Sequence, residues 1–298
     1  MKIAVDIGFG STKFIYNEAF IKFPSAISKL KSSQADIDQA EVLEFNGSKY
    51  LVGDNAIRNA LTTKDYYFLE KYSPLLLYKA FELAKIDNTK QITLATGLSL
   101  MHWSKRAEFA EMLTDFIVNK NRVQVNVKLI PQGKGIYIDY ISKHHHLQKE
   151  LVLVVDIGYN TLDVIPFEHG KAIASEAWAS PQGVNLMVDE VRKRLSQEYN
   201  FSFTEARINN IMQKKTITID GEDRDISLII NEEQENYHEI IINELTTRNP
   251  DIFRSAKAII LAGGGAYYFD NQLTKNIVHT LTPYEYSNVR GYYKSLGE

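Results

Sequence analysis

The sequence predicts an α/β protein made of two related domains that flank a cleft. Apolar runs with an alternating pattern are interspersed with segments whose apolar residues recur at helical spacing, and this succession is typical of sheets covered by helices. The tetrapeptide Val-Asp-Ile-Gly also occurs twice, about half the chain apart. A duplicated half predicts two similar domains, and ligand sites commonly form between domains.

The composition is that of an ordinary globular protein. The 298 residues are 44% hydrophobic and 24% charged, with a formal net charge of −3, which does not indicate direct binding to nucleic acid. The absence of cysteine excludes disulfides and thiolate metal sites and fits a reducing compartment. The longest apolar runs, such as Leu151–Val155, fall far short of the roughly 18 residues that cross a bilayer. We therefore expect a cytoplasmic protein without a membrane partner.

The repeat extends beyond the shared tetrapeptide. Residues 3–13 are IAVDIGFGSTK and residues 153–163 are LVVDIGYNTLD, and a second apolar run follows each copy. Each copy predicts a strand, a tight turn and a second strand, with an aspartate at the bend. The alternative is a chance match between two buried strands, and the similar flanking residues argue against it.

The remaining pattern predicts further elements and a domain division. We expect hairpins at 42–53 and 216–227, strands at 91–96, 123–130 and 258–261, and helices at 64–85, 104–118, 183–199, 232–247, about 270–280 and 284–296. The polar stretch 31–41 predicts a loop. The first domain is expected to comprise residues 1–150 with about 283–298, and the second residues 151–282.

The first turn carries residues suited to binding phosphate. Glycines let backbone N–H groups approach phosphate oxygens, hydroxyls add donors, a lysine adds charge, and an aspartate can hold hydrated Mg²⁺. These residues are Asp6, Gly8, Gly10, Ser11, Thr12 and Lys13. The pattern is neither a Walker P-loop nor a Rossmann fingerprint. The alternative is a glycine-rich turn with an exposed lysine.

The second turn can hold phosphates from the opposite side. Its residues are Asp156, Gly158, Asn160, Thr161 and Asp163. Two carboxylates across one hairpin can serve Mg²⁺ and an attacking water, and burying unpaired aspartates without such a role would be unfavourable. The alternative is an ordinary hairpin with aspartates at turn positions.

A third motif follows the predicted strand at 258–261. Gly263, Gly264 and Gly265 would give a flat backbone surface on which an adenosine could lie. The alternative is a flexible turn between a strand and a helix. The run His144–His146 predicts no metal site, because three adjacent side chains cannot converge on one point of a helix.

The order and spacing of the three motifs resemble the actin-like ATPase superfamily, with two phosphate loops and an adenosine loop. Within it the chain is most similar to the plasmid-segregation actins of the ParM/StbA type. The further matching segments are Phe23-Pro24-Ser25, the Gly47, Tyr50, Gly53, Ala56 pattern, Thr96-Gly97-Leu98 with Ser99 in place of the usual proline, Gly183-Val184, and the Asn288, Gly291, Tyr293 pattern.

This resemblance implies an actin-like, ribonuclease H-like fold and a slow ATPase that polymerises when it binds ATP and Mg²⁺, with GTP left open as a substitute. Asp6, Asp156 and Asp163 would hold the metal, and Gly183 would contact the nucleotide. Asp156 and Gln132 would be catalytic, with the Gln132 amide orienting the hydrolytic water; the alternative for Gln132 is a polar loop residue. Asp163 stands where actin has a histidine.

The implied partners are further copies of the chain in a filament and a DNA-binding adaptor for plasmid segregation. Two other functions remain open on the same scaffold. One is a small-molecule kinase, which would need an acidic base beside a substrate pocket. The other is an actin-like scaffold without a role in segregation.

Overall fold

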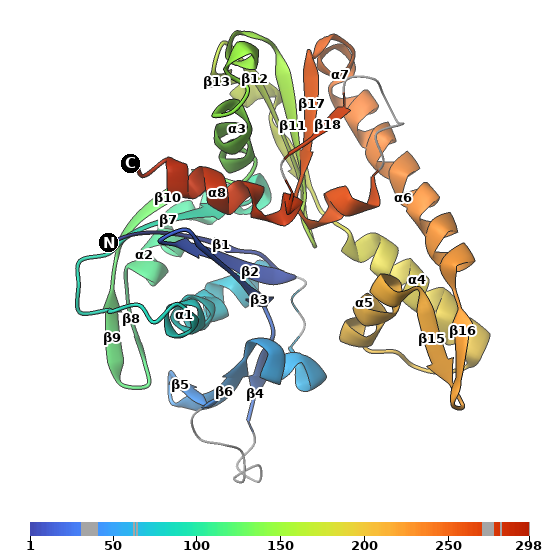
Figure 1. Cartoon of the computed structure of the whole chain (residues 1–298), viewed down its shortest axis with the longest axis horizontal. Coiled ribbons are helices and arrows are strands. Elements are labelled where there is room, and N and C mark those ends of the chain that lie inside the picture. Colours follow the sequence, from blue (N-terminus) through green and yellow to red (C-terminus); the bar gives the residue numbers. More distant parts are fainter. Residues whose placement is uncertain (31–40, 62, 64, 270–276, 281, 298) are drawn as a thin grey trace.

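Two large mixed sheets, one in each half of the chain, form the framework of the protein (Figure 1). The computed structural model describes residues 1–30, 41–61, 63, 65–269, 277–280 and 282–297. None of the helices in these ranges is long and apolar enough to cross a membrane.

The first sheet has the strand order β10-β7-β1-β2-β3. The strands are β1 (Lys2–Ile7), β2 (Ser11–Tyr16), β3 (Ala19–Pro24), β7 (Thr93–Leu98) and β10 (Asn126–Pro131). β1 and β2 form an antiparallel hairpin, whereas β7 and β10 join in parallel on the other side of β1.

The second sheet repeats this arrangement. Its main order is β13-β12-β11-β17-β18, and β14 also pairs with β12. The strands are β11 (Val152–Ile157), β12 (Leu162–Glu168), β13 (Lys171–Ala172), β14 (Trp178–Ser180), β17 (Ala258–Ala262) and β18 (Ile277–His279). β11 and β12 form the antiparallel hairpin, and β17 and β18 join in parallel. The predicted α/β class and the predicted duplication are both confirmed.

Helices cover both faces of each sheet because both faces of the central strands are apolar. On the first sheet, α1 (Tyr66–Leu83) and α2 (Arg106–Thr114) pack against one face, and α8 (Ser287–Lys294) covers the other. On the second sheet, α3 (Lys134–Ile141) covers one face. The other face carries α4 (Asn185–Tyr199), α5 (Glu205–Lys214), α6 (Ser227–Arg248) and α7 (Pro250–Ser255).

The helices α3 and α8 cross where the two halves meet (Figure 1). A Cβ atom added to Gly291 would lie 1.8 Å from the carbonyl oxygen of Gly135, so only glycine allows this approach of the two backbones. The crossing exchanges helices between the halves. α3 belongs to the first predicted domain by sequence but packs on the second sheet, whereas α8 returns from the end of the chain to the first sheet.

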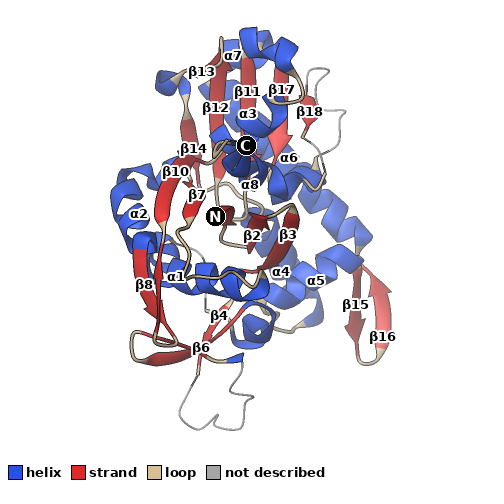
Figure 2. Ribbon diagram, turned by 60° about the vertical axis from the view of Figure 1, so that its left-hand side comes forward, coloured by secondary structure: helices blue, strands red, loops and turns tan. Residues whose placement is uncertain are grey.

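Three smaller sheets lie at the periphery (Figure 2). They are formed by β4 (Ile27–Lys29), β5 (Leu43–Phe45) and β6 (Ser48–Val52), by β8 (Asp115–Val118) and β9 (Asn121–Gln124), and by β15 (Thr216–Ile219) and β16 (Glu222–Asp225). The predicted hairpins at 42–53 and 216–227 are confirmed. Their Asn-Gly and Asp-Gly turns have positive φ at both central residues, as tight hairpins require.

Three predicted elements differ from the structure. The helix expected at 104–118 ends at Thr114, and a hairpin follows whose turn residues, Asn119 and Lys120, both have positive φ. The single strand expected at 123–130 is divided between β9 and β10. The helix expected at about 270–280 is wrong at 277–279, which form strand β18, while 270–276 lie outside the described residues, as do 31–40 of the predicted loop.

Candidate functional site

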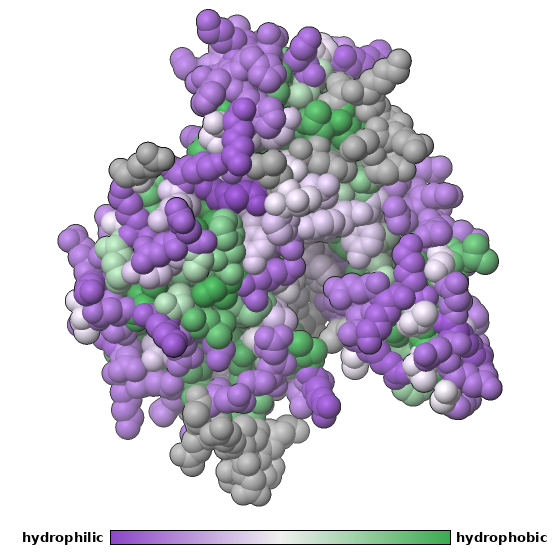
Figure 3. Space-filling view, in the orientation of Figure 1, coloured by the Kyte–Doolittle hydropathy of each residue, from purple (hydrophilic) through white to green (hydrophobic). Residues whose placement is uncertain are grey.

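The two repeated turns place their aspartates at equivalent points of the two sheets. In the first hairpin Asp6 pairs with Lys13, and in the second Asp156 pairs with Asp163. Asp6 is 4% exposed and Asp156 is 5% exposed. Both line a cavity of about 1040 Å³ to which the two halves contribute. The space-filling view in Figure 3 shows a hollow between the two lobes.

In the first half, Asp6 is held by two donors. Lys13 Nζ lies 3.3 Å from Asp6 Oδ2, and Gln132 Nε2 donates to Asp6 Oδ1 at 3.1 Å. Gln132 follows β10 and Asp6 lies on β1, with Gly97 on the strand between them. Because Gly97 has no side chain, the Gln132 amide can extend across β7 to reach the carboxylate.

In the second half, both aspartates are bonded to residues that come from outside their own sheet. Asn288 Nδ2 donates to Asp156 Oδ2 at 2.6 Å. Asp163 Oδ1 accepts hydrogen bonds from Ser99 Oγ at 2.9 Å and from the Leu100 backbone N at 2.6 Å. The second carboxylate pair is therefore tied to the first half and to the C-terminal helix.

Burial makes the two carboxylates of the second half, Asp156 and Asp163, easier to protonate. It raises the pKa of Asp156 to about 7, and the negative charges of Asp163 and Asp6 act in the same direction. Burial also raises the pKa of Asp163 to about 6. Carboxylates this close together are stabilised in their charged form by a cation between them, which is the environment that suits a bound metal.

The lining of the cavity suits a hydrated Mg²⁺ better than a closed metal cage. In the described part of the chain no three or more histidine, aspartate or glutamate groups are arranged to enclose a metal. Mg²⁺ needs only one or two protein carboxylates, because it keeps water and takes phosphate oxygens as further ligands. Asp6 and Asp156 line the cavity and fit this role, whereas Asp163 does not line it.

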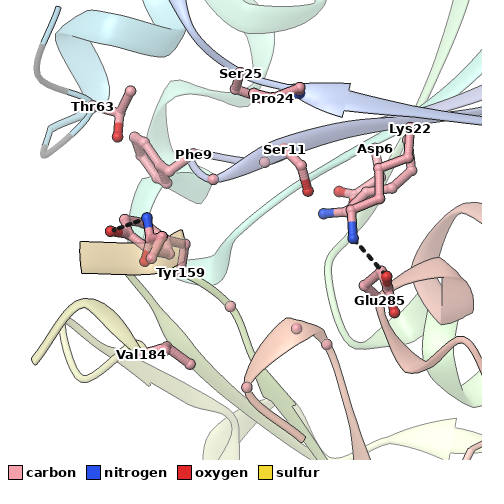
Figure 4. A pocket seen from close by; sticks show the side chains of 18 of the residues that line it. Asp6, Phe9, Ser11, Lys22, Pro24, Ser25, Thr63, Tyr159, Val184 and Glu285 are labelled. Carbon is pink, nitrogen blue, oxygen red and sulfur yellow. Dashed lines mark hydrogen bonds and ion pairs between the residues drawn. The ribbon is translucent and has the colours of Figure 1, made fainter. Parts of the chain in front are cut away.

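Most of the residues predicted for the site line the cavity together. They are Asp6, Gly8, Gly10, Ser11, Lys13, Gln132, Asp156, Gly158, Thr161, Gly263, Gly264 and Gly265. The three sequence motifs, which come from three separate parts of the chain, thus meet around one space (Figure 4).

Four predicted site residues do not line the cavity. Thr12 is fully buried, and its hydroxyl lies 2.9 Å from that of Ser25. The Asn160 side chain donates to the carbonyl of Thr63, and Asp163 faces Ser99 and Leu100. Gly183 packs against the turn backbone, since its Cβ would lie 2.2 Å from Tyr159 O. These residues support the turns from behind.

The glycine loop after β17 forms part of the wall. Gly263 has φ +87°, a conformation that favours glycine, and a Cβ there would lie 2.6 Å from Asp156 Oδ1. A Cβ on Gly265 would lie 2.1 Å from the Ile157 side chain. Gly264 has open space above it, so its backbone faces the cavity without obstruction.

Two contacts made by other cavity residues were not predicted from the sequence. Tyr159 packs on Gly10 across the cleft and donates to Glu205 Oε1 at 2.6 Å. Lys22 Nζ lies 2.7 Å from Glu285 Oε1, a pair drawn in Figure 4. Burial acts to raise the pKa of Glu285, but hydrogen bonds from Lys22 and Tyr267 outweigh it and lower that pKa. No motif identified these residues, because the contacts depend on the folded arrangement.

Comparison with known protein families agrees with the two-part organisation. Residues 4–135 match the family described as actin like proteins N terminal domain. Residues 154–275 match the family described as archaeal actin homologue MreB-like, C-terminal. No sequence among the curated proteins matches the chain.

Solved structures of similar fold extend over nearly the whole chain. A ParM in a 15-stranded filament from Clostridium botulinum has a TM-score of 0.82 and 21% identity, over 99% of this chain and 98% of that one. The archaeal actin homologue Ta0583 has a TM-score of 0.84 and 18% identity, over the same shares. Its complex with ADP has a TM-score of 0.79 and 17% identity, again covering 99% of this chain and 98% of that chain.

The fold, the paired aspartate turns and the two family matches lead to one assignment. The sheets repeat one topology, their hairpin turns face a shared cavity, and the matched regions correspond to the two halves. The chain therefore has the actin-like fold, with an N-terminal region that matches the actin-like N-terminal family and a C-terminal region that matches the archaeal MreB-like family.

Proposed function

We propose that this protein is a slow ATPase of the ParM type that binds ATP with Mg²⁺ in the cleft and assembles into filaments. The observation that carries the proposal is the meeting of Asp6, Asp156 and the 263–265 glycine loop around one cavity. The ADP complex of a structurally similar archaeal actin homologue supports a nucleotide as the ligand. GTP remains a second candidate, because the glycine loop presents backbone rather than a base-specific side chain.

The lining residues divide between binding and chemistry. Gly8, Gly10 and Ser11 would present donors to phosphate oxygens, and Lys13 would neutralise their charge. Asp6 and Asp156 would hold Mg²⁺, which when bound stabilises the negative charge that develops on the phosphates. Thr12, Asn160, Asp163 and Gly183 would act behind this layer, where they hold the turns in place.

Gln132 is the proposed positioning group for the attacking water. Its Nε2 is already used by Asp6, which leaves Oε1 as the acceptor that can orient a water. An amide orients water but is a poor base, so the expected turnover is slow. The hydrogen bond to Asp6 also fixes Gln132 relative to the carboxylate that would hold the metal.

Filament assembly follows from the bridging position of the nucleotide. Phosphates bound from both halves would favour one angle between them, and hydrolysis would remove part of that bridge. A filament that binds the ATP-state angle more tightly would then weaken after hydrolysis. The similar ParM was determined in a filament, which supports head-to-tail assembly here.

The cellular role belongs to the same proposal. We infer that the filament works in the cytoplasm and moves DNA, with a DNA-binding adaptor linking the two, as the resemblance to the ParM type implies. The supporting finding is the overall similarity to ParM structures across 99% of the chain.

Sedimentation and electron microscopy with and without ATP and Mg²⁺ test assembly, while phosphate release tests hydrolysis. We expect a pellet and filaments only with nucleotide and metal. Asp156→Ala should abolish hydrolysis, and Gln132→Ala should slow it while leaving nucleotide binding intact. A pellet that ignores nucleotide, or phosphate release unchanged in both variants, would contradict the proposal.

A further inference from the structure

Tyr292, on the C-terminal helix α8, places a buried hydroxyl directly below the site. Its side chain is completely buried. The ring packs against two glycines, since a Cβ on Gly97 would lie 1.8 Å from Tyr292 Oη and a Cβ on Gly135 would lie 2.6 Å from the ring. The hydroxyl therefore touches the backbone of Gly97, which lines the cavity.

The alternation of side chains along the strands of the first sheet shows which residues share the face that Tyr292 covers. Ala4, Ala95 and Ile130 pack with Tyr292 beneath α8. The residues two positions further along β1 and β7 are Asp6 and Gly97, and side chains two apart share one face of a sheet. Since Gln132 extends across Gly97 to Asp6, the Tyr292 hydroxyl lies under that hydrogen bond.

The hydroxyl is buried and has no hydrogen bond within the described part of the chain. Burial raises the pKa of Tyr292 well above its usual value, and the charges of Asp6, Asp156 and Asp163 raise it further. The group is therefore a protonated donor close to three carboxylates. A buried donor without a partner is unfavourable, and one kept behind the wall of the cavity calls for a specific role.

Helix α8 presents a second polar residue to the same cluster. Asn288 lies one turn before Tyr292, and residues four apart share one side of a helix. Asn288 donates to Asp156, the aspartate of the second half, while the Tyr292 hydroxyl lies against Gly97, on the strand next to that of Asp6, the aspartate of the first half. One side of α8 thus serves the carboxylates from both halves.

We propose that Tyr292 is a positioning residue, whose hydroxyl donates to the Asp6 carboxylate when the cleft holds metal and nucleotide. The bond would fix Asp6 and, through it, the Gln132 amide. This inference rests on the proposed function, because it assigns Tyr292 a part in the binding of Mg²⁺ and in hydrolysis at the same site.

The test compares Tyr292→Phe with the control Tyr137→Phe in the full chain. Each variant removes a buried hydroxyl that lacks a hydrogen bond to any described residue. Tyr137 lies on α3 and stacks on Phe167 with ring centres 3.9 Å apart, and burial alone accounts for its raised pKa. The readouts are kcat and KM for phosphate release, the Mg²⁺ dependence of fluorescent-ADP binding, and thermal unfolding.

For Tyr292→Phe we expect kcat to fall on the order of tenfold, and the Mg²⁺ concentration for half-maximal ADP binding to rise by a similar factor, as for other groups that orient metal ligands. KM should equal the wild-type value within error. The unfolding temperature should equal or exceed that of the wild type. Tyr137→Phe should match the wild type in every readout. Unchanged kcat and Mg²⁺ dependence in Tyr292→Phe would overturn the role.

The two proposals fail in different ways. A wild-type protein that binds ADP with Mg²⁺ but releases no phosphate would refute the proposed hydrolysis, and the Mg²⁺ titration would still decide the role of Tyr292. A wild-type protein that binds no nucleotide would refute both. Equal losses in Tyr292→Phe and Tyr137→Phe would show a general packing effect and would also overturn the specific role of Tyr292.

Discussion

Asn288 donates a 2.6 Å hydrogen bond to Asp156 although the two residues are 132 positions apart. The same amide accepts from the Gly133 backbone N through Oδ1 at 3.0 Å. Asn288 and Asp156 are each 5% exposed, so water competes little for these bonds. A helix packed on the first sheet therefore holds a carboxylate of the second sheet and the chain segment that connects them.

Asn288→Ala should destabilise the nucleotide-free protein by about 1–3 kcal/mol, because it leaves a buried carboxylate and a buried N–H without a partner. It should also weaken Mg²⁺-dependent nucleotide binding. Urea unfolding measures the first effect. The control is Asn231→Ala, which removes an exposed amide that contacts Lys215 and should stay within about 0.5 kcal/mol of the wild type. Equal stability of the two variants would refute the bridging role.

The raised pKa of Asp156 predicts how stability changes with pH. A carboxyl group whose pKa rises on folding favours the folded state most when it is protonated. The stability that Asp156 contributes is thus fully present below its pKa in the unfolded chain, 3.8. It is lost as the pH rises through its pKa in the folded protein, about 7. Without nucleotide, the wild type should lose stability over this range relative to Asp156→Asn. Chemical unfolding of both proteins at pH 5, 6, 7 and 8 measures the difference, and a constant difference would contradict the assigned pKa.

Two glycine-to-alanine substitutions should separate packing from ligand binding. Gly291→Ala places a methyl group 1.8 Å from Gly135 O, so α3 and α8 must move apart. We expect a loss of about 1–3 kcal/mol in unfolding free energy, the usual effect of overpacking. Gly264→Ala meets nothing within 4 Å and should leave stability unchanged, but its methyl group enters the cavity and should weaken nucleotide binding. Thermal unfolding and nucleotide titration on each variant distinguish the two effects.

Local patterns were enough to predict the duplicated hairpins and twelve of the residues that line the cavity. Asp6 and Asp156 each come after a run of apolar residues and two residues before a glycine. These neighbours in the chain were enough to predict that each aspartate lies near the end of a strand. The Asn46-Gly47 turn, likewise, sets its hairpin through its own backbone preferences. By contrast, the turn at Asn119 and Lys120 contains no glycine, and strand β8 before it was predicted as the end of a helix.

The support of the site depends on contacts that no local pattern contains. Thr12 and Asn160 belong to the motifs, yet they do not line the cavity, because side chains alternate along a strand and a turn can direct an amide to a neighbouring segment. The pattern of Asn288, Gly291 and Tyr293 drew attention to Asn288, but its partner Asp156 could be found only in the folded chain. The same pattern included Tyr293, whereas the residue below the site is Tyr292.

Ser99, which bonds to a buried aspartate of the second half, predicts a pH-dependent effect. Its hydroxyl donates to Asp163, and this bond opposes the rise that burial causes in the pKa of that carboxyl. The bond therefore favours the ionised form, and Ser99→Ala should raise the pKa of Asp163 further. The resulting destabilisation, about 1–3 kcal/mol for a bond to a charged group, should be present at pH 8 and smaller at pH 5, where Asp163 is mostly protonated.

The matched control for this effect is Ser73→Ala. Ser73, like Ser99, is buried, but its hydroxyl has no hydrogen bond to any described residue. Its removal should be neutral or stabilising by the same amount at both pH values, because no charged group depends on it. Urea unfolding of the wild type and both variants at pH 5 and pH 8, without nucleotide, measures the effect. If Ser99→Ala loses as much stability at pH 5 as at pH 8, its hydroxyl does not act through the charge of Asp163.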